Sequence, residues 1–144
     1  MYLCKYLAAI VCFAMLFSCS KNNSSSTTTT TTTNAAVGFW VGTGVTTSGS
    51  ATTTQPVTLV LKSDNKLRLY LGSSSASDTA TLAAANKSDG SYTVSGTSIS
   101  CSYTYSGALL LLAATANSTF TSMTGTAGLS PSTTGIGTFT FTKQ

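Results

Sequence analysis

Hydrophobic and polar residues alternate along most of the chain after residue 37. In residues 98–105 (SISCSYTY), every second residue is apolar or aromatic, and serine or threonine stands between. Residues 137–143 (GTFTFTK) repeat the pattern with two phenylalanines. A period of two places alternate side chains on opposite faces of a β-strand, and we find no sustained 3.6-residue helical period here. The pattern predicts an all-β domain.

Other segments show strand and turn signals of the same kind. Residues 57–61 and 67–71 alternate Val or Leu with other residues and flank a polar turn, so they predict a β-hairpin. Turns are also expected at residues 86–90 and 106–107, where a positive φ costs little. The remaining strand candidates are residues 38–45, 78–85, 91–95, 108–116 and 118–128.

These eight or nine short strands predict an antiparallel meander, because the turns between them are too brief to hold crossover helices. Closing the meander into a small up-and-down barrel of about eight strands covers its apolar face and removes exposed edges. A two-sheet β-sandwich is the alternative. The barrel is preferred because the sequence lacks the cysteine and tryptophan spacing of immunoglobulin domains.

The beginning of the chain follows a different pattern. Lys5 precedes an uninterrupted apolar run, residues 7–17, a layout typical of a secretory signal peptide. The run is too short for a membrane-spanning helix, which needs about 20 apolar residues. Residues 16–19 (LFSC) resemble the lipobox of bacterial lipoproteins, which has an aliphatic, a variable and a small residue before a cysteine.

This resemblance implies cleavage between Ser18 and Cys19, a diacylglyceryl group on the Cys19 sulfur, and acylation of the new amino group. Several acyl chains give stable membrane anchoring where a single chain does not. Ser20 replaces the aspartate that retains Gram-negative lipoproteins at the inner membrane, so the cell envelope, and within it the outer membrane, is the expected location. A soluble secreted protein is the alternative.

Between the signal and the folded part lies a tract rich in serine and threonine, residues 19–36, with seven consecutive threonines. Nothing in it can bury an apolar face, so a flexible tether is expected. Attachment of sugars to this tract, or to Thr79, is the alternative. The expected organisation is therefore a signal peptide at 1–18, a lipidated linker at 19–36 and a barrel domain at 37–144.

Short motifs at both ends of the folded part resemble those of lipocalin-like (calycin-like) domains in Gram-negative lipoproteins. The opening motif is Gly-x-Trp-x-Gly at residues 38–42, and the closing motif is Gly-Thr-Phe-Thr at residues 137–140. The resemblance implies a small β-barrel held at a membrane. It implies no particular reaction, because the activity of such lipoproteins is unsettled.

Composition argues against catalysis. Only 7% of the residues are charged, and the chain has no histidine and no glutamate. Its aspartates, Asp64, Asp78 and Asp89, occupy turn-like contexts, where such side chains bond to local amides. Cys101 falls on an apolar strand face, where a thiol behaves as a small hydrophobe. We expect no enzyme activity, no cofactor and no metal site, since zinc sites need clusters of cysteine and histidine.

Two functional classes remain for a protein of this kind. The preferred one is a structural or protein-interaction role, with the barrel interior filled by the protein's own side chains, including the leucine run at 109–112. The alternative is binding of a small apolar ligand inside the barrel, since eight strands leave room for little more. The candidate lining residues for such a ligand are Trp40, Tyr70, Tyr103 and Tyr105.

The positive charges give one further candidate site. Lys62, Lys66 and Arg68 gather around one predicted hairpin and are candidates for contact with the phosphates of lipid head groups. A solubilising hairpin tip is the alternative. So few charges on an exported protein predict no nucleic-acid binding. The expected partners are the membrane, through the lipid anchor, and an envelope protein or a small apolar ligand.

Overall fold

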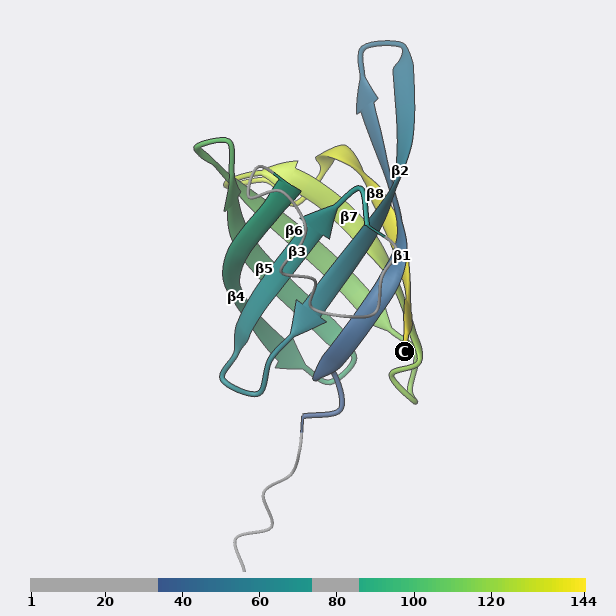
Figure 1. Ribbon diagram of the computed structural model, residues 1–144, viewed down its shortest axis with the longest axis vertical. Coiled ribbons are helices and arrows are strands. Elements are labelled where there is room, and N and C mark those ends of the chain that lie inside the picture. The colour runs from purple at the N-terminus through teal and green to yellow at the C-terminus, as the bar shows by residue number, and fades with distance from the viewer. Residues whose placement is uncertain (1–33, 74–85) are drawn as a thin grey trace, which may run out of the picture. The chain divides into compact units, whose positions relative to one another are not determined.

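The computed structural model describes residues 34–73 and 86–144, which form an eight-stranded antiparallel β-barrel (Figure 1). Neighbouring strands follow chain order, and pairing of β1 with β8 closes the sheet. The prediction of an all-β fold, with a barrel preferred over a sandwich, is therefore confirmed. The strands are β1 (Gly38–Ser48), β2 (Ala51–Leu61), β3 (Lys66–Leu71), β4 (Lys87–Ser95), β5 (Ser98–Tyr105), β6 (Ala108–Ala116), β7 (Ser122–Leu129) and β8 (Gly135–Lys143).

Two predicted turns are confirmed. Between β2 and β3, the backbone amide of Lys66 donates to Oδ1 of Asp64 at 3.0 Å, and Asn65 takes a φ of 62°. Between β5 and β6, Ser106 and Gly107 have φ values of 48° and 80°. Two consecutive residues with positive φ suit the twist of a tight antiparallel hairpin.

The turn predicted at residues 86–90 is wrong, because β4 already begins at Lys87. Asp89 therefore lies within a strand and pairs across the sheet with Arg68 of β3. Gly90 serves a close approach between strands, since a Cβ there would lie 2.0 Å from the backbone oxygen of Ser102. Local turn propensity is overridden here by sheet pairing.

Two further strand predictions need comment. The candidate at 118–128 begins too early: β7 starts at Ser122, after a loop in which Oδ1 of Asn117 accepts hydrogen bonds from the amides of Thr121 and Ser122. The candidate at 78–85 lies outside the described residues. Within the described part of the chain, no helix is long and apolar enough to cross a membrane.

One end of the barrel is closed around Trp40. Its indole Nε1 donates to the backbone oxygen of Ala36 at 2.8 Å, and both residues are fully buried. The amino group of Lys143 lies 5.7 Å from the centroid of the Trp40 ring and donates to the backbone oxygen of Ala35 at 2.6 Å. Residues 34–36, which the sequence placed in the linker, therefore pack against this end of the barrel.

The β1–β2 hairpin projects beyond the rest of the barrel (Figure 1). The last pair between β1 and β8 at this end joins Thr46 to Gly137, and the last pair between β2 and β3 joins Val57 to Leu71. Residues 47–52 therefore pair only with one another in the described structure, and we call them the β1–β2 ribbon. Sequence analysis ended the flanking strands earlier because the ribbon has no apolar alternation.

The seam that closes the barrel combines glycines with phenylalanines. On β1, Gly42 stands opposite Phe141 and Gly44 opposite Phe139. On the other side of β8, Gly125 of β7 also stands opposite Phe139. The two aromatic rings lie 5.3 Å apart between centroids and are tilted by 54°. Glycines beside aromatic rings let the strands approach closely and curve.

We predict that Gly42→Ala destabilises the barrel much more than Gly44→Ala. A Cβ at Gly42 would lie 1.8 Å from the backbone oxygen of Thr140, which cannot move without disturbing the seam. A Cβ at Gly44 would meet a movable side-chain atom of Val57 at 3.2 Å. Chemical denaturation should give a loss of about 2–3 kcal/mol for Gly42→Ala and under about 1 kcal/mol for Gly44→Ala. Equal losses would contradict this account of the seam.

Candidate ligand cavity

A cavity of about 380 Å³ lies in the half of the barrel away from Trp40. It reaches the end of the barrel, because its lining includes Ser106 of the β5–β6 turn and the residues that flank the β7–β8 loop, Leu129 and Ile136. A volume of this size falls in the range of small-molecule sites, about 300–1,000 Å³. The deeper apolar lining consists of Val57, Leu69, Leu110, Leu112, Phe139 and Phe141.

The cavity follows from the sizes of the inward-facing side chains along the barrel axis. At the closed end, most of the inward side chains are large and almost completely buried, although Ala114 and Ala116 of β6 are small. In the other half, glycine and alanine occupy inward positions on β1, β6, β7 and β8. An eight-stranded barrel holds a limited volume, so small residues leave part of it unfilled. The large residues are Trp40, Leu59, Leu61, Leu67, Ile99 and Met123, and the small ones are Gly44, Ala108, Ala127 and Gly137.

Of the four aromatic residues predicted from the sequence to line a ligand site, the structure places two beside the cavity and two elsewhere. Tyr103 and Tyr105 line the cavity. Trp40 does not, because it lies in the closed end. Tyr70 does not either: β3 turns Leu69 inward, so Tyr70 points to the outer face, where it is only 1% exposed. Two of the four candidates are thus brought together at the site.

The leucine run on β6 is divided between the two faces of the sheet. Leu110 and Leu112 point inward and form part of the cavity wall, whereas Leu109 points outward and is 48% exposed. The run therefore lines the interior at this level without filling it. The sequence predicted the strand correctly. It did not predict the free space in front of the leucines, because that space depends on the small residues of the neighbouring strands.

Burial raises the pKa of two ionisable groups in the interior, Tyr103 and Cys101. Burial raises the pKa of Tyr103 to about 12, with smaller contributions from Cys101 and Tyr105. Burial likewise raises the pKa of Cys101 to about 12. Both side chains are therefore protonated at neutral pH, and the thiolate that would act as a nucleophile or metal ligand is suppressed.

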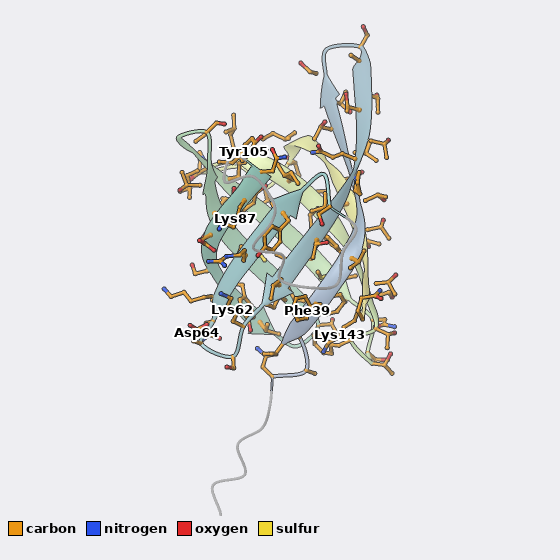
Figure 2. All side chains as sticks on the ribbon, in the orientation of Figure 1. Phe39, Lys62, Asp64, Lys87, Tyr105 and Lys143 are labelled. Carbon is orange, nitrogen blue, oxygen red and sulfur yellow. The ribbon has the colours of Figure 1, made fainter. Side chains whose placement is uncertain are left out.

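The three cationic candidates do not form one free patch. Lys62 and Lys66 flank the β2–β3 turn, and Figure 2 shows Lys62 at the closed end of the barrel, far from Tyr105. Arg68 lies on the outer face of β3 and makes an ion pair with Asp89, with Nε–Oδ1 and Nη2–Oδ2 distances of 2.5 and 3.2 Å. The hydrogen bond from Arg68 lowers the pKa of the Asp89 carboxyl.

Several sequence predictions fall on residues that the structure leaves undescribed. These are the cleavage and lipidation site at Ser18 and Cys19, most of the linker, and the sugar-acceptor candidate Thr79. Within residues 34–73 and 86–144, no group of three or more His, Cys, Asp or Glu side chains could hold a metal ion. Cys101 is buried and unpaired within the same part of the chain.

Comparison with protein-family models gives no match, and comparison with curated proteins gives no significant similarity. The eight-stranded antiparallel barrel is compatible with the lipocalin-like fold that the motifs imply, and no family or relative adds to that.

We predict that the thiol of Cys101 is inert in the folded protein. Residues 34–144 contain all eight strands and every pairing that closes the barrel, and Cys101 is their one cysteine. At pH 8, iodoacetamide should alkylate this chain at least about 100-fold more slowly when folded than in guanidinium chloride, as followed by mass spectrometry. Rapid alkylation of the folded chain would show that the thiol is accessible and its pKa not raised.

Proposed function

We propose that this protein is a lipid-anchored protein of the bacterial cell envelope whose barrel binds a small apolar ligand without catalysing a reaction. The observation that carries the proposal is the apolar cavity of about 380 Å³ at one end of the barrel. Concave, mostly apolar sites with a few polar groups are the usual form of small-molecule sites.

The cavity supports a moderate affinity. A ligand that buries roughly 300 Å² of apolar surface would gain roughly 7.5 kcal/mol before the entropy cost of association is subtracted. We therefore expect dissociation constants in the micromolar range or weaker. Such an affinity suits a ligand that is taken up and released, because tight retention would require more specific polar contacts than the cavity wall provides.

The structure bears on the choice between the two functional classes. Sequence analysis preferred a surface role because it expected a filled interior. Small inward residues, Ala108 and Ala127 among them, leave space in front of Leu110 and Leu112, and this geometry favours the ligand-binding alternative. The aromatic residues suited to contact the ligand are Tyr103 and Tyr105.

A surface role stays as the second candidate because of the β1–β2 ribbon. Its residues are Thr, Ser, Gly and Ala, all uncharged and mostly exposed. Neither edge of the ribbon pairs with another described strand. Unpaired strand edges without charged residues are favourable sites for a strand of another protein to add to the sheet. An envelope protein with an extended segment is the partner that such a ribbon would take.

The lipid anchor is supported by sequence alone. The LFSC motif at residues 16–19 follows an apolar run of signal-peptide length, and a serine and threonine tract separates it from the barrel. Acyl chains on Cys19 would hold the protein at the membrane, and Ser20 favours the outer membrane. The cations Lys62 and Lys66 lie near the end of the barrel where the chain enters, which is the end suited to contact head groups.

We predict that filling the cavity abolishes ligand binding. The neutral fluorophore N-phenyl-1-naphthylamine, added to residues 34–144, should be excited by energy transfer from Trp40, the single tryptophan of the chain. Leu110→Trp should weaken binding at least tenfold, because the larger side chain occupies the cavity, whereas Leu109→Trp on the outer face should not. Since both variants add a tryptophan, direct excitation of the fluorophore gives the dissociation constants. Equal binding by the two variants would contradict a ligand site inside the barrel.

We predict that Cys19→Ser abolishes lipidation. Cells that are fed a radiolabelled or alkyne-tagged fatty acid should label the unchanged protein and the control variant Cys12→Ser, but not Cys19→Ser, because a hydroxyl does not replace the thiol as acceptor of the diacylglyceryl group. Density-gradient fractionation should place the labelled protein in the outer membrane. Absence of label from the unchanged protein would refute the lipoprotein assignment and leave the cavity proposal standing.

A further inference from the structure

None of the charged side chains of the described barrel lines the cavity. Lys87, which begins β4 and pairs with Tyr70 of β3, is the charge nearest the cavity end that lies outside the lining. Lys62, Asp64 and Lys143 lie at the closed end, on the far side of the barrel from Tyr105 (Figure 2). Arg68 and Asp89 face outward and neutralise each other in an ion pair. Every described residue in the cavity lining is uncharged. The wall therefore offers neither a cation nor an anion to a bound molecule.

The cavity wall contains no acidic or basic side chain among its described residues, only phenols. The only ionisable side chains among its described residues are Tyr103 and Tyr105. Burial raises the pKa of Tyr103 to about 12, so its phenol stays protonated well above neutral pH. A carboxylate or sulfonate placed in the cavity would meet no counter-ion in this wall.

Transfer of a charged ligand from water into this uncharged cavity would carry a high desolvation penalty. Moving an ion from water into an apolar site is strongly unfavourable unless it is paired there and hydrogen-bonded. The polar groups near the mouth, such as the amide of Gln55 and the hydroxyls of Thr46 and Ser106, are neutral. They can bond to an uncharged polar group of a ligand but do not balance a full charge.

From this distribution of charge, and resting on the proposed ligand-binding function, we infer that the cavity selects neutral apolar molecules and rejects anionic amphiphiles of similar shape. Uncharged aromatic or terpenoid molecules belong to the first class. Free fatty acids belong to the second.

Two fluorophores that share one skeleton test this inference. N-phenyl-1-naphthylamine is neutral, and 8-anilino-1-naphthalenesulfonate is the same arylamine with a sulfonate added. Fluorescence titration of folded residues 34–144 at pH 7 should give a dissociation constant at least tenfold higher for the anionic fluorophore. Leu110→Trp controls for binding outside the cavity, since only binding inside the cavity is lost in that variant.

Substitutions at the mouth should shift this selectivity in opposite directions. Gln55 lines the cavity on β2 and is partly exposed, so it can carry a charge without full burial. Gln55→Lys should lower the ratio of the two dissociation constants, anionic over neutral, at least threefold. Gln55→Glu should raise the ratio. Circular dichroism of both variants confirms that the barrel is folded.

The outcomes separate this inference from the function on which it rests. If only the neutral fluorophore binds, or if it binds at least tenfold more tightly than the anionic one, both the ligand-binding function and the inferred selectivity are supported. Equal or tighter binding of the anionic fluorophore, lost in Leu110→Trp, overturns the inference but keeps the cavity as a ligand site. An unchanged ratio in both Gln55 variants also overturns it, because charge would then not govern selection. Binding of neither fluorophore overturns the proposed function itself.

Discussion

Pairing of β1 with β8 is the constraint on which the rest of the structure depends. Once the sheet closes, its eight strands fix the interior volume, and the inward side chains determine how much of that volume is filled. The seam forms because Gly42 and Gly44 leave room for Phe141 and Phe139 on the neighbouring strand. Gly44 also leaves space in the interior, where it lines the cavity. Closure and cavity thus both depend on small inward residues, and Gly44 takes part in both.

The strand pattern could be predicted from the sequence because its cause is local. The alternation of apolar and polar residues in β5 and β8 indicates which side chains face inward. The serine and glycine of the β5–β6 turn suit a tight hairpin. Predictions failed where distant contacts decide the conformation. Residues 86–90 have the composition of a turn, yet pairing with β3 and β5 draws most of them into a strand. The β1–β2 ribbon was missed because threonine without apolar partners gives no periodic signal.

The candidate site was predictable only in part. Tyr103 and Tyr105 follow from the inward parity of β5, and the parity of β3 would have placed Tyr70 outside had it been applied to that residue. Trp40 faces inward, as its position in the alternating pattern of β1 indicates, but it lies at the closed end of the barrel and not beside the cavity. The level of each residue along the axis depends on the register between strands, which no single strand reveals. The cavity depends on that level, so it could not be read from alternation.

The two ends of the barrel differ in a way that gives the molecule a direction. The chain enters the barrel at the closed end, where Trp40 is hydrogen-bonded to Ala36, whereas the cavity reaches the opposite end. Among the described residues, the entry of the chain and the cavity therefore lie at opposite ends of the barrel. In the proposed ligand-binding role, uptake and release would both take place at the end of the barrel opposite Trp40, so the closed end is free to serve other contacts.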